Sequence, residues 1–128
     1  MSRADLMKSY IGEHASFSGK FLNNQVLTID GRFEGERIEV NELYIGKTGK
    51  VMSGIKANYV IVEGIVIGDI EAWNRVILMP SAKVLGKITT NELIIQKGVI
   101  FEGTCVILNQ ADPETTRSDI QRLYEQDN

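Results

Sequence analysis

The sequence is poor in cysteine, proline and histidine, and it has no long apolar run. The lone Cys105 cannot form an internal disulfide, so we expect a cytosolic protein in which Cys105 is a small buried apolar residue. A spanning helix needs about 20 apolar residues and a signal peptide about 7–15, whereas no apolar run here exceeds four. We therefore expect neither. The two prolines exclude a collagen-like chain, and the 43% hydrophobic content excludes a disordered one.

The net charge of −3 comes entirely from the end of the sequence. Residues 109–128 carry five acidic and two basic side chains, which leaves twelve of each sign in residues 1–108. Proteins that bind nucleic acids usually present a net basic face. We therefore expect no nucleic-acid partner.

A repeat of about 17 residues runs through most of the sequence. Six segments share the pattern of a large apolar residue, any residue, a small residue, any residue and a mostly apolar residue. They begin at Phe17, Phe33, Val51, Val66, Val84 and Phe101, which are 16, 18, 15, 18 and 17 positions apart. A second series lies between them and begins at Leu27, Leu43, Val60, Val76 and Leu93. Two interleaved series with one period indicate a repeated structural unit.

The pattern inside each repeat has a period of two, which is typical of β-strands. Two places deviate: Arg37 replaces the final apolar residue, with Ile38 one step later, and Ser53 replaces glycine. Residues 9–108 show no helical apolar stripe, so the strands form either an antiparallel meander or a coil with one repeat per turn. Only Asp30-Gly31 resembles a hairpin turn, which favours the coil. The glycines then fit a tight corner without room for a side chain.

We therefore predict an all-β, single-domain β-solenoid of about six turns of about 17 residues, in which equivalent residues stack about 4.8 Å apart. The predicted rod is about 30 Å long at that spacing. One inward ladder should contain the six residues that begin the first series, and another the five that begin the second. Three regions follow: an N-terminal tail over 1–8, the β-solenoid over 9–108 and a polar, acidic C-terminal tail over 109–128.

At this point the sequence resembles the bactofilins, a bacterial family of polymer-forming cytoskeletal proteins. The resemblance lies in the order and spacing of Phe17-Ser18-Gly19, Ile29 to Gly35, Val66 to Ile70, Val84 to Ile88 and Lys97 to Gly103. It implies a right-handed parallel β-helix that polymerises end to end without nucleotide or other cofactor. It also implies attachment to the inner membrane face through a short N-terminal segment, and a scaffold role for cell-wall enzymes, cell shape or other bactofilins.

The ends of such a coil are candidate assembly surfaces, because each presents an open row of backbone N–H and C=O groups that recruits further strands. Residues 1–8 are too few for a good cap, and the chain stays apolar up to Leu108. The predicted polymerisation residues are Phe101, Cys105, Ile107, Phe17 and Phe21. The resemblance also implies that a phenylalanine in the last turns matters for polymerisation, which Phe101 matches. The alternative is that Phe101 is only the last core residue.

The two tails leave alternatives open. Met1, Leu6 and Met7 form a candidate membrane contact, with Arg3 and Lys8 beside them for anionic lipid; the alternative is a disordered start. In the C-terminal tail, Asp112-Pro113-Glu114 is typical of a helix start. Ile120, Leu123 and Tyr124 then follow at helical spacing. This tail is either a short helix docked on the rod, in one variant covering the end turn, or a mobile segment.

No residue pattern predicts an enzyme. Gly46-Lys47-Thr48 lacks the earlier glycine of a P-loop, since position 41 is Asn, and it reads as a turn. His14 is the only histidine, too few for a His₃ metal site. Two competing functions are a left-handed β-helix acyltransferase and a β-solenoid adaptor that does not polymerise. The acyltransferase repeat gives 18 residues per turn, whereas the spacings here average 16.8. Trp73 is expected at a corner, either as a lateral contact or packed against it.

Overall fold

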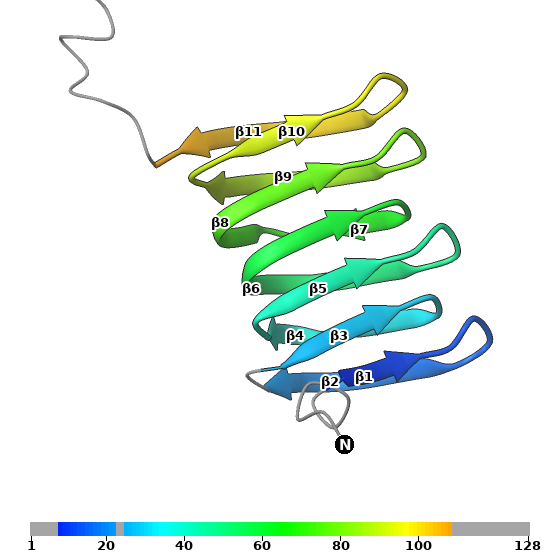
Figure 1. The fold of residues 1–128 in the computed structure, drawn as a ribbon. Coiled ribbons are helices and arrows are strands. Elements are labelled where there is room, and N and C mark those ends of the chain that lie inside the picture. Colours follow the sequence, from blue (N-terminus) through cyan, green and yellow to red (C-terminus); the bar gives the residue numbers. More distant parts are fainter. Residues whose placement is uncertain (1–7, 23–24, 109–128) are drawn as a thin grey trace, which may run out of the picture.

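The computed structural model describes residues 8–22 and 25–108, and within them it contains eleven β-strands and no helix. The strands wind as a coil whose successive turns lie on top of one another (Figure 1). They are β1 Lys8–Ile11, β2 Ser16–Leu22, β3 Val26–Ile29, β4 Arg32–Glu39, β5 Glu42–Ile45, β6 Lys50–Val62, β7 Ile65–Ile67, β8 Ile70–Leu78, β9 Lys83–Thr90, β10 Leu93–Ile95 and β11 Ile100–Ile107.

The strands pair in parallel between neighbouring turns, in the register that the repeat predicts. Phe17 pairs with Phe33, and this column continues through Val51, Val66, Val84 and Phe101. The second column runs from Leu27 through Leu43, Val60, Val76 and Leu93. Parallel pairing excludes the antiparallel meander. The predicted β-solenoid of about six turns is confirmed.

The core is a single apolar cluster that extends along the interior of the coil. Its side chains come from the inward positions of every turn, because alternate residues of a strand point to opposite faces. Phe33, Leu43 and Val76 are completely buried. Each such side chain stabilises the fold by about 1.5–3 kcal/mol. Since each turn covers the turn before it, the inner turns are buried on both sides.

A column of small residues forms one corner of the coil, as predicted. It contains Gly19, Gly35, Ser53, Gly68, Gly86 and Gly103. Four of its glycines have positive φ angles, such as 145° at Gly86, which L side chains rarely adopt. A Cβ atom at Gly86 would also overlap with the carbonyl oxygen of Gly68 in the turn before. The stacking of backbone on backbone therefore requires glycine at Gly86, whereas Ser53 occupies the same column without a positive φ angle.

Two β-bulges account for irregularities of the repeat. In β4, Gly19 pairs with Gly35 but Lys20 pairs with Arg37, so Glu36 is an extra residue. This insertion delays the inward residue to Ile38, which pairs with Phe21 in register. In β8, Ala72 pairs with Ala57 but Arg75 pairs with Tyr59. This second bulge contains Trp73, whose side chain is 65% exposed. An extra residue re-aims a side chain, and here it turns Trp73 outward.

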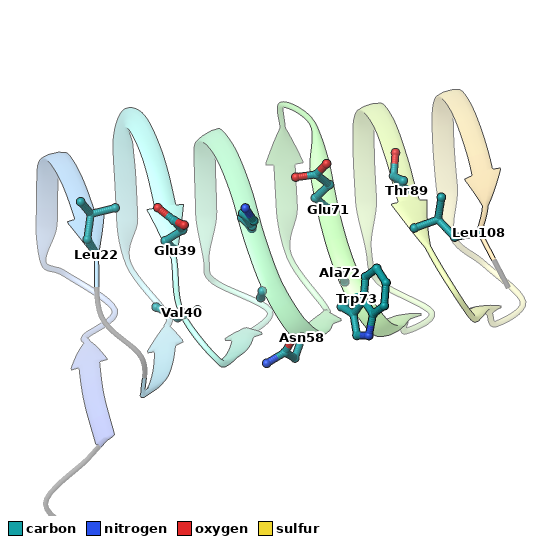
Figure 2. Close-up of a pocket in the computed structure, with 11 residues that line it drawn as sticks. Leu22, Glu39, Val40, Asn58, Glu71, Ala72, Trp73, Thr89 and Leu108 are labelled. Atoms are coloured by element: carbon teal, nitrogen blue, oxygen red, sulfur yellow. The ribbon is translucent and has the colours of Figure 1, made fainter.

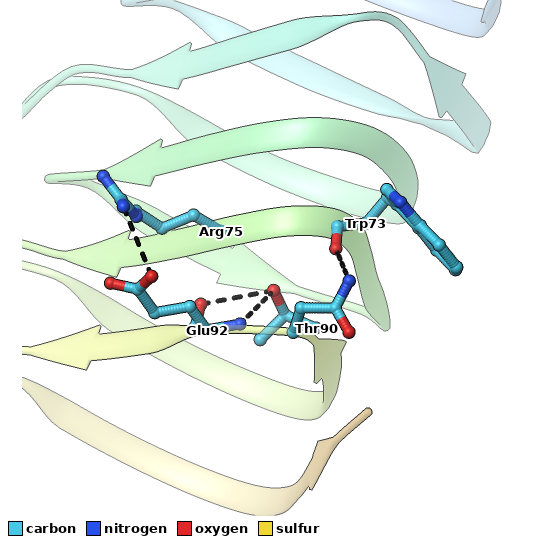
Figure 3. A network of polar contacts seen from close by, with 5 residues as sticks. Trp73, Arg75, Thr90 and Glu92 are labelled. Atoms are coloured by element: carbon cyan, nitrogen blue, oxygen red, sulfur yellow. Dashed lines mark hydrogen bonds and ion pairs between the residues drawn. The ribbon is translucent and has the colours of Figure 1, made fainter. Parts of the chain in front are cut away.

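Polar contacts between turns follow the corner next to the second bulge (Figure 3). The guanidinium of Arg75 donates to Glu92 at 3.2 Å, and the Asn91 side-chain amide donates to the carbonyl oxygen of Trp73. Within one turn, the Thr90 hydroxyl donates to the carbonyl oxygen of Glu92 at 3.2 Å. The ion pair is exposed, so it contributes at most about 1 kcal/mol. These bonds fix the path of the backbone around Trp73.

Candidate functional site: the two end faces of the solenoid

The last turn of the coil leaves an apolar surface uncovered. This C-terminal end face consists of the inward residues Leu93, Ile95, Val99, Phe101, Cys105 and Ile107. Among the described strands, β10 pairs only with β8 and β11 only with β9. Ile95 is 50% exposed, whereas its partner one turn earlier, Leu78, is completely buried. Within the described residues, the face is therefore a core layer without a next turn, and the backbone edge beside it pairs with no further described strand.

Cys105 is exposed, so its predicted burial is wrong. It pairs with Ile88, which is completely buried, and thus occupies an inward position. The physical reason for its exposure is its place in the last turn, where no further described strand covers it. The repeat correctly assigned Cys105 to the inward column, but burial there also needs a neighbouring turn on each side.

The first turn presents the opposite surface. This N-terminal end face contains Phe17 and Phe21, which are both partly buried against the core. The ring of Phe17 stacks on Phe33 at 5.0 Å and meets the edge of Phe21 at 5.9 Å. Such aromatic pairs contribute about 0.5–1.5 kcal/mol beyond their buried area. Both rings are thus held in place by the second turn.

The five predicted polymerisation residues lie at opposite ends of the described rod. Phe101, Cys105 and Ile107 belong to the C-terminal end face, and Phe17 and Phe21 to the N-terminal one. They do not form one site within a chain, and no described residue covers either end face from outside. Sequence reasoning did not name Leu93, Ile95 and Val99 as interface residues. The signal was present for Leu93, since it ends the second inward ladder.

An outward column of apolar residues was also missed. Met52, Ile67 and Leu85 pair in register on the outer face and are 40–51% exposed. The same column contains Glu34 in the turn before and Glu102 in the last turn. The stripe is therefore short and has an acidic residue at each end.

The other candidate sites have structural explanations. Residues 46–49 form a turn between β5 and β6, as predicted, and the Thr48 hydroxyl donates to the carbonyl oxygen of Asp30 at 2.6 Å. The hydroxyl of Tyr10 donates to the Asp30 carboxylate at 2.6 Å, and this bond is the main cause that raises the pKa of Tyr10. Within the described ranges, no three His, Cys, Asp or Glu side chains gather into a candidate metal site. The candidate membrane residues Met1, Leu6 and Met7, and the predicted tail helix, lie outside the described residues.

Comparison with known proteins agrees with this architecture. Residues 9–106 match the model of the family described as "Bactofilin: Polymer-forming cytoskeletal". The chain belongs to the bactofilin family. It is 30% identical over 112 residues to bactofilin BacP of Myxococcus xanthus, a match that covers 88% of this chain and 45% of BacP. It is 29% identical to bactofilin BacO of the same organism, over 79% of this chain and 81% of BacO.

The fold of this bactofilin matches that of a solved relative. The structure of the cytoskeletal bactofilin BacA, determined by solid-state NMR, aligns with a TM-score of 0.72 at 29% identity. The alignment covers 81% of this chain and 99% of that one. The chain spans less than half the length of BacP. In the part that the structure describes, no helix is long and apolar enough to cross a membrane.

Proposed function

We propose that this bactofilin assembles end to end, through the two end faces of its solenoid, into filaments that need no nucleotide. The observation that carries the proposal is the uncovered last core layer, with Ile95 half exposed and Cys105 exposed. An open β-edge beside exposed apolar residues favours addition of another strand layer. A second chain would cover both at once. The filament serves as a scaffold, and we propose no enzymatic activity and no cofactor for it.

Electron microscopy of the purified protein without nucleotide tests this function. We expect filaments, and most of the protein should pellet in an ultracentrifuge. Discrete trimers would support the acyltransferase alternative, and stable monomers would support an adaptor that does not polymerise. Either result would overturn the proposal.

Assembly should protect Cys105 from thiol reagents. It is the only cysteine, and it is exposed on the C-terminal end face. Covering this face should slow the reaction with a maleimide by about tenfold or more, because the labelling rate is proportional to the fraction of chains whose end face is open to solvent. The measurement is labelling of Cys105 in filaments and in dilute, unassembled protein. A Leu85→Cys, Cys105→Ser chain is the control, since Leu85 lies on the outer face and should react equally in both. Equal labelling of Cys105 in both states would argue against end-to-end contacts.

We further propose that the filament lies on the inner face of the cell membrane, in the cytoplasm, and there positions cell-wall enzymes, cell-shape machinery or other bactofilins. Met1, Leu6 and Met7 are the proposed membrane contacts. A single short apolar segment binds lipid weakly, because each buried CH₂ contributes only about 0.8 kcal/mol. A filament presents many such segments side by side, and multivalency strengthens their combined binding.

Removing the apolar contacts should release the filament from membranes. We expect Leu6→Ser with Met7→Ser to lower the fraction of protein that floats with liposomes containing anionic lipid in a density gradient by about tenfold or more, since several buried CH₂ groups are lost per chain. Pelleting without liposomes should stay unchanged. Asp5→Asn is the matched control and should strengthen binding, because it removes a negative charge near anionic lipid. Unchanged binding by the double variant would refute the membrane contact while leaving the filament proposal intact.

A further inference from the structure

A groove follows the corner of the solenoid from its first turn to its last (Figure 2). Its volume is about 710 Å³, which is within the range of ligand sites rather than packing defects. Small buried residues, Val40, Ala57 and Ala72, line it together with the exposed side chain of Trp73. We call this feature the corner groove. An exposed apolar concave surface of this size marks a binding site.

The chain itself leads into the corner groove. Leu108 is the last described residue, and its side chain is one of those that line the groove. Twenty residues of the sequence follow it, and Ile120 is twelve positions further on. Residues 109–112 precede the proposed helix, and Ile120 lies about 10 Å along a helix that starts at Pro113. Trp73 lies two turns before Leu108, which is also about 10 Å at the spacing of stacked turns. Tethering at Leu108 also gives the segment a high effective concentration at the groove.

The sequence of this segment suits the groove. Ile120, Leu123 and Tyr124 share one side of a helix that could start at Pro113. They would provide the apolar side chains that Ala57 and Ala72 leave room for. Aromatic packing of Tyr124 on Trp73 would add to the contact.

We propose that residues 113–124 fold as a helix in the corner groove of their own chain and cover Trp73. This contact is internal to one chain, so it is independent of filament assembly. Failure of this proposal would leave the end-to-end assembly unaffected.

Trp73 is the only tryptophan and reports directly on the groove. We expect acrylamide to quench its fluorescence weakly in the full chain. The triple variant Ile120→Asp, Leu123→Asp, Tyr124→Asp should raise the quenching constant by about twofold or more and shift the emission to longer wavelength, since an exposed indole meets water and quencher freely. The matched control, Ser118→Asp with Gln121→Asp and Gln126→Asp, adds the same charge away from the apolar stripe and should leave the quenching constant unchanged.

A mixing experiment distinguishes a chain's own tail from that of a neighbour. A Trp73→Phe chain with the natural tail is mixed with the triple variant, so that only the variant fluoresces. Persistent strong quenching supports docking within one chain, whereas restored protection shows that a neighbour's tail fills the groove and overturns the proposal. Equal quenching of the natural chain and the triple variant also overturns it, and leaves the groove to another protein.

Discussion

Phe101→Arg is expected to abolish filament formation while leaving the subunit folded. Phe101 lies on the C-terminal end face, stacked on Val84 and only partly buried. A guanidinium there can reach solvent in a single subunit, but end-to-end contact would bury it without a partner. Loss of an aromatic anchor costs about 2 kcal/mol or more, and a buried charge adds to this. Because about 1.4 kcal/mol is tenfold in affinity, the critical concentration should rise by about 100-fold or more.

Two control variants distinguish a role of Phe101 at the interface from a role in the core. Val84→Arg places the same charge one turn inward, where the side chain is 3% exposed, and should unfold the chain. Glu102→Arg places it on the outer face of β11, next to Phe101, and should still give filaments. The measurements are pelleting for assembly and circular dichroism for the β-structure. An unfolded Phe101→Arg chain would mean that Phe101 acts only as the last core residue, whereas folded filaments would exclude it from the interface.

The stacking of turns could be predicted from the sequence because every turn must meet the same packing requirement. An inward residue must fit the space beside its equivalent in the next turn, so Leu27, Leu43 and Val60 recur at nearly constant spacing. The glycine corner follows for the same reason, since backbone stacks on backbone there. The sequence also showed that the inward position of this repeat comes one residue late, at Ile38, and the bulge in β4 explains this delay.

Other features depend on what surrounds a residue, which the repeat does not contain. Cys105 has the pattern of a core residue and is nevertheless exposed, because it lies in the last described turn and no further described strand covers it. The corner groove is a property of the surface between turns. Trp73 projects outward because β8 contains a one-residue insertion. Only the strand pairing reveals its position, since Ala57 pairs with Ala72 but Tyr59 pairs with Arg75. The candidate assembly residues were predicted, but their separation onto two opposite faces required the structure.

The core and the proposed interface are chemically the same surface. Val84 covers Val66 within the chain, and Phe101 covers Val84 in turn. A second chain on Phe101 would add one more layer of the kind that already stabilises the fold. Filament growth would then resemble continued folding of the solenoid, which is consistent with assembly that uses no nucleotide. The same reasoning makes the stability of the rod depend on how closely its turns can stack.

Gly86→Ala is therefore expected to destabilise the subunit strongly. Gly86 has a φ of 145°, a conformation that costs an L residue about 1–3 kcal/mol. Its new Cβ atom would also overlap with the carbonyl oxygen of Gly68 in the neighbouring turn. Overpacking of this kind adds about 1–3 kcal/mol. The sum is a large part of the roughly 5–15 kcal/mol that stabilises a domain. Guanidinium unfolding below the assembly concentration measures the change.

Gly19→Ala is the matched control, because it keeps the strain and removes the overlap. Gly19 belongs to the same corner column and has a φ of 119°, but a Cβ atom there would meet nothing within 4 Å. Its substitution should lower the free energy of unfolding only by the cost of the positive φ angle, about 1–3 kcal/mol. The difference between the two variants then isolates the contribution of close stacking between turns. Equal losses of stability would mean that positive φ alone requires glycine in this column, and that the turns can move apart to accept a methyl group.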